Sequence, residues 1–159
     1  MITQHDRDAH LPIFLDAGWY AEVVSHERIE EIGSYATYFM PNQLESELIT
    51  GEQSEEEAVT RLAELVPTAV VKVGPRGVLA CRQGQLFACP ALPIENVVDT
   101  TGAGDAFNGG FIYGILRGYA LPDALRCGII CGSLSTSALG GTAAVPSADE
   151  LERIRLRPQ

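Results

Sequence analysis

The amino-acid sequence predicts an α/β fold in which helices pack on a mostly parallel sheet. Short apolar segments, several of them rich in β-branched residues, alternate with segments of helical spacing along most of the chain. This alternation is typical of a sheet whose strands are joined by helices. The chain has 159 residues, of which 46% are hydrophobic and 20% charged, as in an ordinary soluble domain with a buried core.

Four elements are expected near the start of the chain, after a polar lead-in at residues 1–11. Residues 12–16 form a short apolar run that ends in Asp-Ala-Gly, which predicts a buried strand followed by a turn. Residues 25–33 have helical spacing and a glycine at the end. Residues 38–40 predict a second strand, and residues 43–50 predict a short helix that ends at the following glycine.

The middle of the chain predicts a helix, a strand and a hairpin. Ser54 and the glutamate three residues later have the spacing of a capping box, which opens a helix that stops near Pro67. A strand rich in valine follows at residues 69–73. Residues 77–81 and 85–89 flank an Arg-Gln-Gly turn and predict a β-hairpin.

The last third predicts three helices. Residues 96–99 are expected to form a strand that leads through a glycine-rich turn into a helix over residues 104–117. Pro122 opens the next helix, which runs toward residues 139–141 and ends at two glycines. Ser147 caps a final short helix.

The charge balance excludes several classes of function. Eleven Lys and Arg residues against 21 Asp and Glu residues give a net charge of −10. Binding to nucleic acid or to anionic lipid needs a basic surface, so neither partner is expected. No apolar run reaches the length of a membrane span, and the polar N-terminus does not resemble a secretory signal. We therefore expect a cytoplasmic protein. Its four cysteines are expected to be small buried thiols and not disulfides: Cys81, Cys89, Cys127 and Cys131.

The most informative segment is residues 99–110, Asp-Thr-Thr-Gly-Ala-Gly-Asp-Ala-Phe-Asn-Gly-Gly. Small residues let a ligand approach the backbone, and the N–H groups at a helix start favour an anion such as phosphate. The segment lacks both the glycine spacing of a dinucleotide fingerprint and the Gly-Lys-Ser/Thr of a P-loop. Asp105 is then either a general base beside a transferring phosphoryl group or the N-cap of the helix, and the pattern leaves both open.

Residues 99–110 resemble the C-terminal signature of the ribokinase-like (PfkB) carbohydrate kinases. The resemblance implies a three-layer ribokinase-like fold with a mostly parallel central sheet. It implies that Asp105 is the catalytic base. It also implies that the turn formed by Gly102, Ala103 and Gly104 is the anion hole for the phosphoryl group.

The same resemblance implies a cation site and covers only part of a family member. Asp99 and Thr101 match positions that hold a monovalent cation, usually K⁺, together with a second loop that residues 139–141 match loosely. The likeness extends from about residue 12 to residue 146. It corresponds to the C-terminal half, so residues 12–159 are expected to be the nucleotide-binding and catalytic part, without the N-terminal half and the lid.

Two further motifs of the family occur earlier in the chain. Asn42 and Glu45 match its Asn-x-x-Glu motif, which implies that the acid acts through water on Mg²⁺ and the phosphates of ATP. By itself this motif more often marks a solvated helix start, and its distance before the glycine signature favours the functional interpretation. A strand followed by Gly-x-x-Gly, which contains Lys72, Gly74 and Gly77, resembles the turn that lies along ATP. Lys72 is either a phosphate ligand or a strand-end lysine at a solvated edge.

These features favour an enzyme that phosphorylates a hydroxyl of a sugar or related small molecule with ATP and Mg²⁺. The alternative is an inactive or partner-dependent nucleotide-binding half-domain. The expected ligands are a nucleotide and a sugar-like molecule, and the expected protein partner is either a second copy or a complementing chain. A domain unrelated to kinases, with a purely structural glycine turn, is disfavoured because three motifs of the family occur in order.

Overall fold

The computed structural model describes residues 11–18, 31 and 33–157. The chain divides into two compact units, of which the first comprises Met1–Val73 with Leu79–Phe87 and the second Gly74–Val78 with Ala88–Gln159. The expected lead-in at residues 1–11 and the helix expected over residues 25–33 lie almost entirely outside the described residues.

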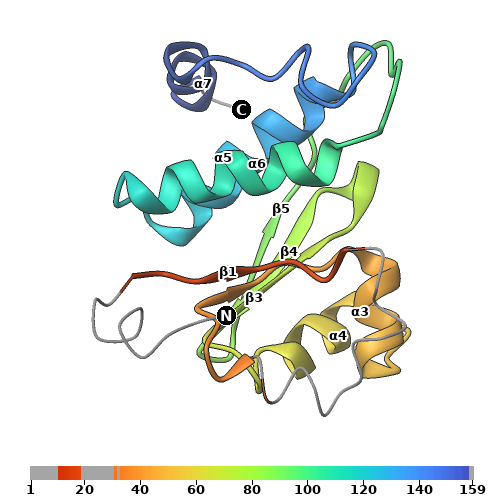
Figure 1. The fold of residues 1–159 in the computed structure, drawn as a ribbon, viewed down its shortest axis with the longest axis vertical. Coiled ribbons are helices and arrows are strands. Elements are labelled where there is room, and N and C mark those ends of the chain that lie inside the picture. Colours follow the sequence, from red (N-terminus) through yellow and green to blue (C-terminus); the bar gives the residue numbers. More distant parts are fainter. Residues whose placement is uncertain (1–10, 19–30, 32, 158–159) are drawn as a thin grey trace. The chain divides into compact units, whose positions relative to one another are not determined.

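The described residues contain one five-stranded sheet, whose strands follow the order of the sequence. The two pairs formed by the first three strands are parallel, with Phe14 beside Tyr38 and Tyr38 beside Thr68. The last two strands form the expected hairpin around Gln83 and Gly84, whose positive φ angles of 53° and 75° suit a tight two-residue turn. The strands, shown in Figure 1, are β1 (Phe14–Leu15), β2 (Tyr38–Phe39), β3 (Thr68–Lys72), β4 (Val78–Arg82) and β5 (Gln85–Cys89).

The first strand is less buried than the sequence predicted. Both residues of β1 are half-buried, whereas Tyr38 and Phe39 of β2 are buried. β1 is the terminal strand of the sheet order, so within the described residues only one strand flanks it. Its Phe14 ring stacks on Tyr38 at 4.9 Å between ring centroids.

Among the described residues of the first unit, α3 (Gln43–Thr50) and α4 (Glu55–Leu62) cover the sheet (Figure 1). α3 ends at the predicted Gly51. The side chain of Ser54 accepts a hydrogen bond from the Glu57 N–H, which confirms Ser54 as the N-cap of α4. α4 ends at Leu62, before the predicted stop near Pro67. The core between these helices and the sheet consists of Ala36, Phe39, Ile49, Val59, Leu62, Val66, Ala69, Val71, Val73 and Cys81.

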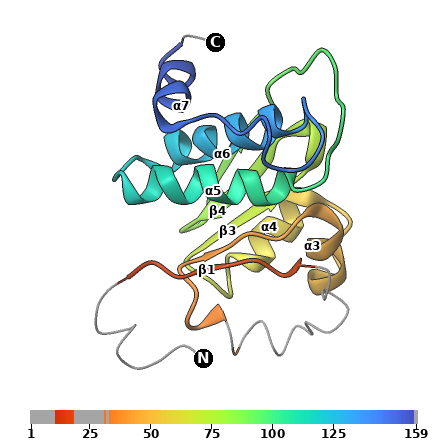
Figure 2. The same ribbon diagram turned by 45° about the horizontal axis from the view of Figure 1, so that its top comes forward.

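Three helices belong to the second unit: α5 (Ala103–Leu116), α6 (Leu121–Ser135) and α7 (Ala148–Arg155). α5 and α6 lie side by side (Figure 2). Two glycines of α5 permit this close approach: a Cβ atom at Gly110 would lie 2.5 Å from the carbonyl oxygen of Cys127, and one at Gly114 would lie 2.7 Å from Cα of Ala124. The predicted cap at Ser147 is confirmed, with a complete capping box.

Two sequence-based predictions in the second unit are wrong. Residues 96–99 do not form a strand, because the N–H groups of Val98 and Asp99 donate to the carbonyl of Thr136 and not to a sheet. α6 ends at Ser135 and does not reach residues 139–141. The hydroxyl groups of Thr136 and Ser137 donate to carbonyls of the preceding helical turn, an arrangement that competes with further helix.

All four cysteines are free thiols. Cys81, Cys127 and Cys131 are buried as expected, whereas Cys89 is half-buried. Burial raises the pKa of Cys127 and of Cys131 to about 11, so both remain protonated at neutral pH. In the described part of the chain, no helix is long and apolar enough to cross a bilayer.

Candidate functional site

Most of the predicted site residues fall into two groups, one in each compact unit, and Gly74 and Gly77 lie in a separate short segment of the second unit. We call residues 99–105 the glycine turn; it belongs to the second unit. We call Asp16, Asn42, Glu45 and Lys72 the strand-end cluster; it belongs to the first unit.

The glycine turn leads directly into α5. Gly102 is the N-cap of the helix, and its φ of 73° is a left-handed conformation that side chains other than glycine rarely adopt. Asp105 lies in the first turn of α5 and is exposed. No side chain caps this helix. The alternative in which Asp105 serves as the N-cap is therefore wrong, and its carboxylate is left to solvent.

The start of α5 presents backbone donors around Asp105. An α-helix leaves the N–H groups of its first residues without an intrahelical partner, and in α5 these belong to Ala103, Gly104 and Asp105. The Ala103 N–H donates to the carbonyl of Thr100 at 3.2 Å, and the first intrahelical bond runs from Ala106 to Gly102 at 2.9 Å. The donors of Gly104 and Asp105 therefore face the end of the helix, where the helix dipole favours an anion.

Asp99 ties the glycine turn to the loop that follows α6. Its Oδ1 accepts a hydrogen bond from the Thr101 N–H at 2.9 Å, and its Oδ2 accepts one from the Gly140 N–H at 3.0 Å. These hydrogen bonds, that from Thr101 first, lower the pKa of the Asp99 carboxyl group below its ordinary value. Asp99 is therefore an anion that holds two loops together.

The two loops also touch through their backbones. A Cβ atom at Gly141 would lie 2.8 Å from the carbonyl oxygen of Thr101 and 2.9 Å from Cα of Gly102. The loop that the sequence matched only loosely thus lies beside Asp99 and Thr101. The carboxylate and carbonyl oxygens of this corner are the type of donor that a hard cation prefers.

The strand-end cluster is built at the carboxyl ends of three neighbouring parallel strands. Asp16 directly follows β1, Asn42 follows β2 after two residues, and Lys72 is the last residue of β3. Asn42 and Lys72 pair as an isolated parallel bridge. The carboxyl edge of a parallel sheet is where α/β proteins commonly bind ligands.

Asn42 and Glu45 form a capping box at the start of α3. The Asn42 side chain accepts a hydrogen bond from the Glu45 N–H at 2.9 Å, and Glu45 Oε2 accepts one from the Asn42 N–H at 2.8 Å. The motif is a helix start, as its alternative description expected, but its acid is not solvated, because Glu45 is only 8% exposed. Burial raises the pKa of Glu45, against the opposing hydrogen bond from Asn42. The neighbouring Asp16 raises this pKa further, whereas Lys72 lowers it.

Lys72 forms an ion pair with Asp16, with 2.7 Å between Nζ and Oδ2. The Lys72 side chain is only 13% exposed, so the prediction of a strand-end lysine at a solvated edge is wrong. Sequence reasoning did not select Asp16 as a site residue. The available signal was its place directly after an apolar strand, the position at which α/β proteins put ligand-binding side chains.

Gly74 and Gly77 enclose a short 3₁₀ turn, Gly74–Arg76. Gly74 has a φ of 58°, and a Cβ atom there would meet no atom within 4 Å. At Gly77, a Cβ atom would lie 2.1 Å from the carbonyl oxygen of Cys89. Gly77 is therefore required by packing against the chain after β5, and Gly74 by its backbone conformation.

Comparison with known proteins was made by sequence and by structure. The sequence profile for the pfkB family carbohydrate kinases matches residues 2–148. A ribokinase of Haemophilus influenzae is 28% identical over 127 residues, which are 76% of this chain and 41% of that protein. A cytidine kinase of Thermococcus kodakarensis is 40% identical over 107 residues, which are 64% of this chain and 37% of that protein.

Among solved structures, a ribokinase of Arabidopsis thaliana complexed with ribose and ATP superposes with a TM-score of 0.82. The two sequences are 25% identical, and the match covers 96% of this chain and 50% of that chain. The chain therefore spans half or less of the length of these relatives. The likeness confirms the expected α/β fold class.

Proposed function

Because the chain belongs to the pfkB family of carbohydrate kinases, we propose that the protein transfers the γ-phosphoryl group of ATP to a hydroxyl of a sugar or nucleoside. The observation that carries this proposal is the placement of Asp105 in the first turn of α5, exposed and not engaged in capping. A free carboxylate beside the N–H groups of a helix start combines a base with an anion site, which is what phosphoryl transfer requires.

In the proposed reaction, Asp105 accepts the proton of the acceptor hydroxyl as its oxygen attacks the γ-phosphorus, and ADP leaves. The turn of Gly102, Ala103 and Gly104 stabilises the charge on the transferring group. The N–H groups at the start of α5 support this role, although that of Ala103 is already engaged with Thr100. A positioned base contributes about 10²–10⁴-fold to such a rate.

We assign the nucleotide and its Mg²⁺ to the strand-end cluster and the neighbouring glycines. Glu45 would act on Mg²⁺ through water, with its carboxylate oriented by the Asn42 N–H. Within the described residues, no group of three or more His, Cys, Asp or Glu side chains could hold a metal ion. Mg²⁺ commonly keeps several waters and binds through one or two carboxylates plus substrate phosphates, and Glu45 fits that mode. Lys72, with Gly74 and Gly77 after it, would lie along the phosphates.

A monovalent cation, K⁺ in the proposal, would bind beside Asp99 and Thr101. The oxygen donors of this corner and its direct contact with the glycine turn support the assignment. A cation there would neutralise Asp99 and hold the two loops in the arrangement that presents the helix start.

The acceptor pocket is proposed to come from outside residues 12–159, either from the remainder of a longer protein or from a complementing chain or second copy. The relatives named above act on ribose and on cytidine by their names, which supports an acceptor with a ribose-like hydroxyl. An ATP-consuming enzyme of this kind is expected in the cytoplasm.

The second candidate function is nucleotide binding without transfer. Two measurements test the candidates, and the second separates them. Mg·ATP should raise the melting temperature under both, since a ligand at 100 times its dissociation constant adds about 2.7 kcal/mol. Release of ADP on addition of ribose or cytidine occurs only if the protein is a kinase, and absence of both effects contradicts both functions.

A further inference from the structure

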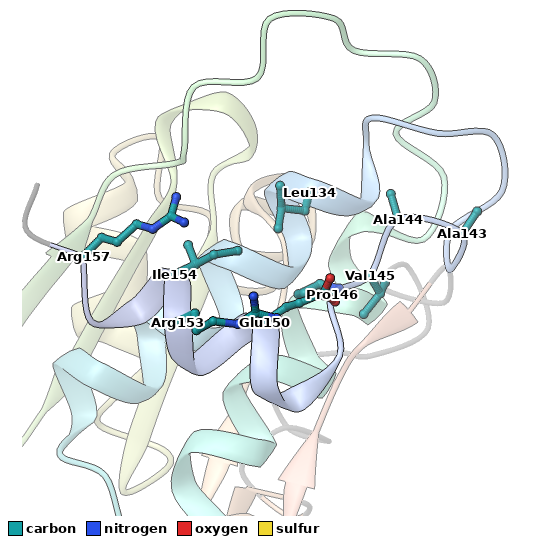
Figure 3. Close-up of a pocket in the computed structure, with 9 residues that line it drawn as sticks. All are labelled: Leu134, Ala143, Ala144, Val145, Pro146, Glu150, Arg153, Ile154 and Arg157. Carbon is teal, nitrogen blue, oxygen red and sulfur yellow. The ribbon is translucent and has the colours of Figure 1, made fainter.

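A groove in the second unit lies outside all the residues assigned to phosphoryl transfer (Figure 3). It is formed by the end of α6, residues 143–146 and one side of α7, and it has a volume of about 460 Å³. Pockets for small molecules typically measure about 300–1,000 Å³. The groove is therefore large enough for a small organic ligand.

Two kinds of side chain line this groove. Leu134 of α6, Val145 and Pro146 of the loop, and Ile154 of α7 contribute apolar side chains to a lining whose exposed surface is mostly polar (Figure 3). Arg153 and Arg157, four residues apart on or just after α7, lie on either side of Ile154 in the sequence and carry positive charge to the same groove.

The arginines on and after α7 differ in whether they form ion pairs. Arg155 forms ion pairs with Glu152 and Asp123, and its guanidinium lies 4.3 Å from the centre of the Tyr119 ring. None of the ion pairs among the described residues involves Arg153 or Arg157. Arg153 Nε donates a hydrogen bond to the carbonyl of Asp149 at 3.2 Å, and the charge of Arg153 helps to lower the pKa of the neighbouring Glu150.

The one acid in the lining is already engaged. Glu150 Oε2 accepts hydrogen bonds from the N–H of Ser147 at 2.9 Å and from its hydroxyl at 2.7 Å. These bonds lower the pKa of Glu150, so it stays ionised as the acid of the capping box that Ser147 opens. The lining thus carries two arginine charges against one carboxylate, in a chain whose net charge is −10.

We propose that this groove binds a small organic anion, with its apolar body against Leu134, Val145, Pro146 and Ile154 and its acidic group on Arg153 and Arg157. Guanidinium groups bind carboxylate, sulfonate and phosphate oxygens through charge-assisted hydrogen bonds, which are the strong class of hydrogen bond. The apolar side chains beside the two guanidinium groups suit an anion that also has an apolar part.

The loop residues that line the groove follow directly on the segment whose Gly140 N–H donates a hydrogen bond to Asp99. The Ala143 N–H donates to the Gly140 carbonyl at 3.3 Å, and the Gly140 N–H donates to Asp99. A ligand that contacts Ala143 and Val145 therefore stabilises a segment that is two hydrogen bonds from Asp99. The binding itself is independent of the proposed phosphoryl transfer.

The probe for this site is 1-anilinonaphthalene-8-sulfonate, whose fluorescence reports binding. N-phenyl-1-naphthylamine, which lacks the sulfonate, serves as the uncharged control probe. The test variant is R153Q/R157Q, and the control variant R61Q/R82Q loses the same charge at exposed positions that do not line the groove. Melting temperatures establish that each variant folds.

The proposal expects the sulfonate to bind the unaltered protein and the R61Q/R82Q variant with similar affinity. It expects R153Q/R157Q to bind about tenfold more weakly or worse, with no such loss for the neutral probe. Equal sulfonate affinity in all three proteins, equal losses for both probes, or no binding to the unaltered protein would overturn it. Displacement of the sulfonate by ATP would assign the groove to the nucleotide and would likewise overturn a separate site.

Discussion

Asp99 and Gly140 are joined by a hydrogen bond of 3.0 Å from the Gly140 N–H to Asp99 Oδ2, across 41 residues of sequence. The other oxygen of the same carboxylate accepts the N–H of Thr101, only two residues away. One side chain thus sets the local turn before α5 and also attaches that turn to the loop after α6. The glycine turn is therefore a tertiary structure and not only a local motif.

The Asp99→Asn substitution should lower the stability of the protein in a pH-dependent way. The amide replaces one carboxylate oxygen with an NH₂ group, which cannot accept the N–H of Thr101 or Gly140, so the variant should unfold at a lower urea concentration at pH 7. The pKa of Asp99 is lowered by folding, so its contribution is present above the ordinary value of 3.8 and is lost as the pH falls through the folded-state value. The stability gap between the two proteins should narrow between pH 5 and about pH 3. A gap that is equal at both pH values would contradict this account of Asp99.

Asp105→Asn should abolish phosphoryl transfer and leave nucleotide binding nearly unchanged. The amide keeps the size of the side chain but cannot accept the hydroxyl proton, so the rate should fall by at least about 10²-fold. Because Asp105 is exposed and does not cap α5, the melting temperature should not change. The measurement is ADP release with an active acceptor, beside calorimetric titration with Mg·ATP. A variant that retains full activity would rule out Asp105 as the base.

The ion pair between Lys72 and Asp16 should show a measurable coupling in a double-mutant cycle with Lys72→Met and Asp16→Asn. Lys72 is 13% and Asp16 30% exposed, so water screens the pair only in part. We expect a coupling of about 1 kcal/mol in the free energy of urea unfolding. The exposed pair Arg61–Glu64 provides the control cycle, with a coupling of about 0.5 kcal/mol or less. Equal couplings in the two cycles would mean that burial does not strengthen the Lys72 pair.

Gly110→Ala should destabilise the protein, whereas Gly109→Ala should not. A Cβ atom at Gly110 would lie 2.5 Å from the Cys127 carbonyl oxygen and 2.7 Å from the Cys131 sulfur, so α5 and α6 would have to separate. Overpacking of this kind costs about 1–3 kcal/mol. A Cβ atom at Gly109 would meet nothing within 4 Å. Alanine there should therefore raise the free energy of unfolding by up to about 1 kcal/mol through its higher helix propensity. The free energy of urea unfolding of each variant tests these two predictions. If Gly110→Ala left it unchanged, α5 and α6 would be less tightly packed than the structure indicates.

Local signals in the sequence predicted much of the secondary structure. The helix at residues 43–50 has the predicted bounds, and the two-residue turn at Gln83 and Gly84 joins the predicted hairpin strands. The cap at Ser147 is also present. Each of these features depends on side chains only a few residues apart, so the local sequence is sufficient to predict it. The family signature likewise led to the ribokinase-like α/β fold, which the profile match and the solved structures confirm.

Other features depend on partners far away in the chain. Residues 96–99 have β-branched side chains, yet their N–H groups bond to Thr136 at the end of α6. The end of α6 was misplaced because the hydroxyl groups of Thr136 and Ser137 turn back onto the helix before the glycines are reached. No local pattern distinguishes these outcomes from a strand or a longer helix.

The residues of the candidate site show the same difference between local signals and distant partners. The sequence alone was sufficient to predict roles for Asp105, Gly102 and the Asn-x-x-Glu motif, because phosphate chemistry requires particular residue types in a short, fixed order. Only the folded chain brought Asp16 to Lys72 across 56 residues and Gly140 to Asp99, and only it left Asp105 out of the helix cap. The physical reason is that charge pairing and burial act between neighbours in space, and three parallel strands and two packed helices decide which residues become neighbours.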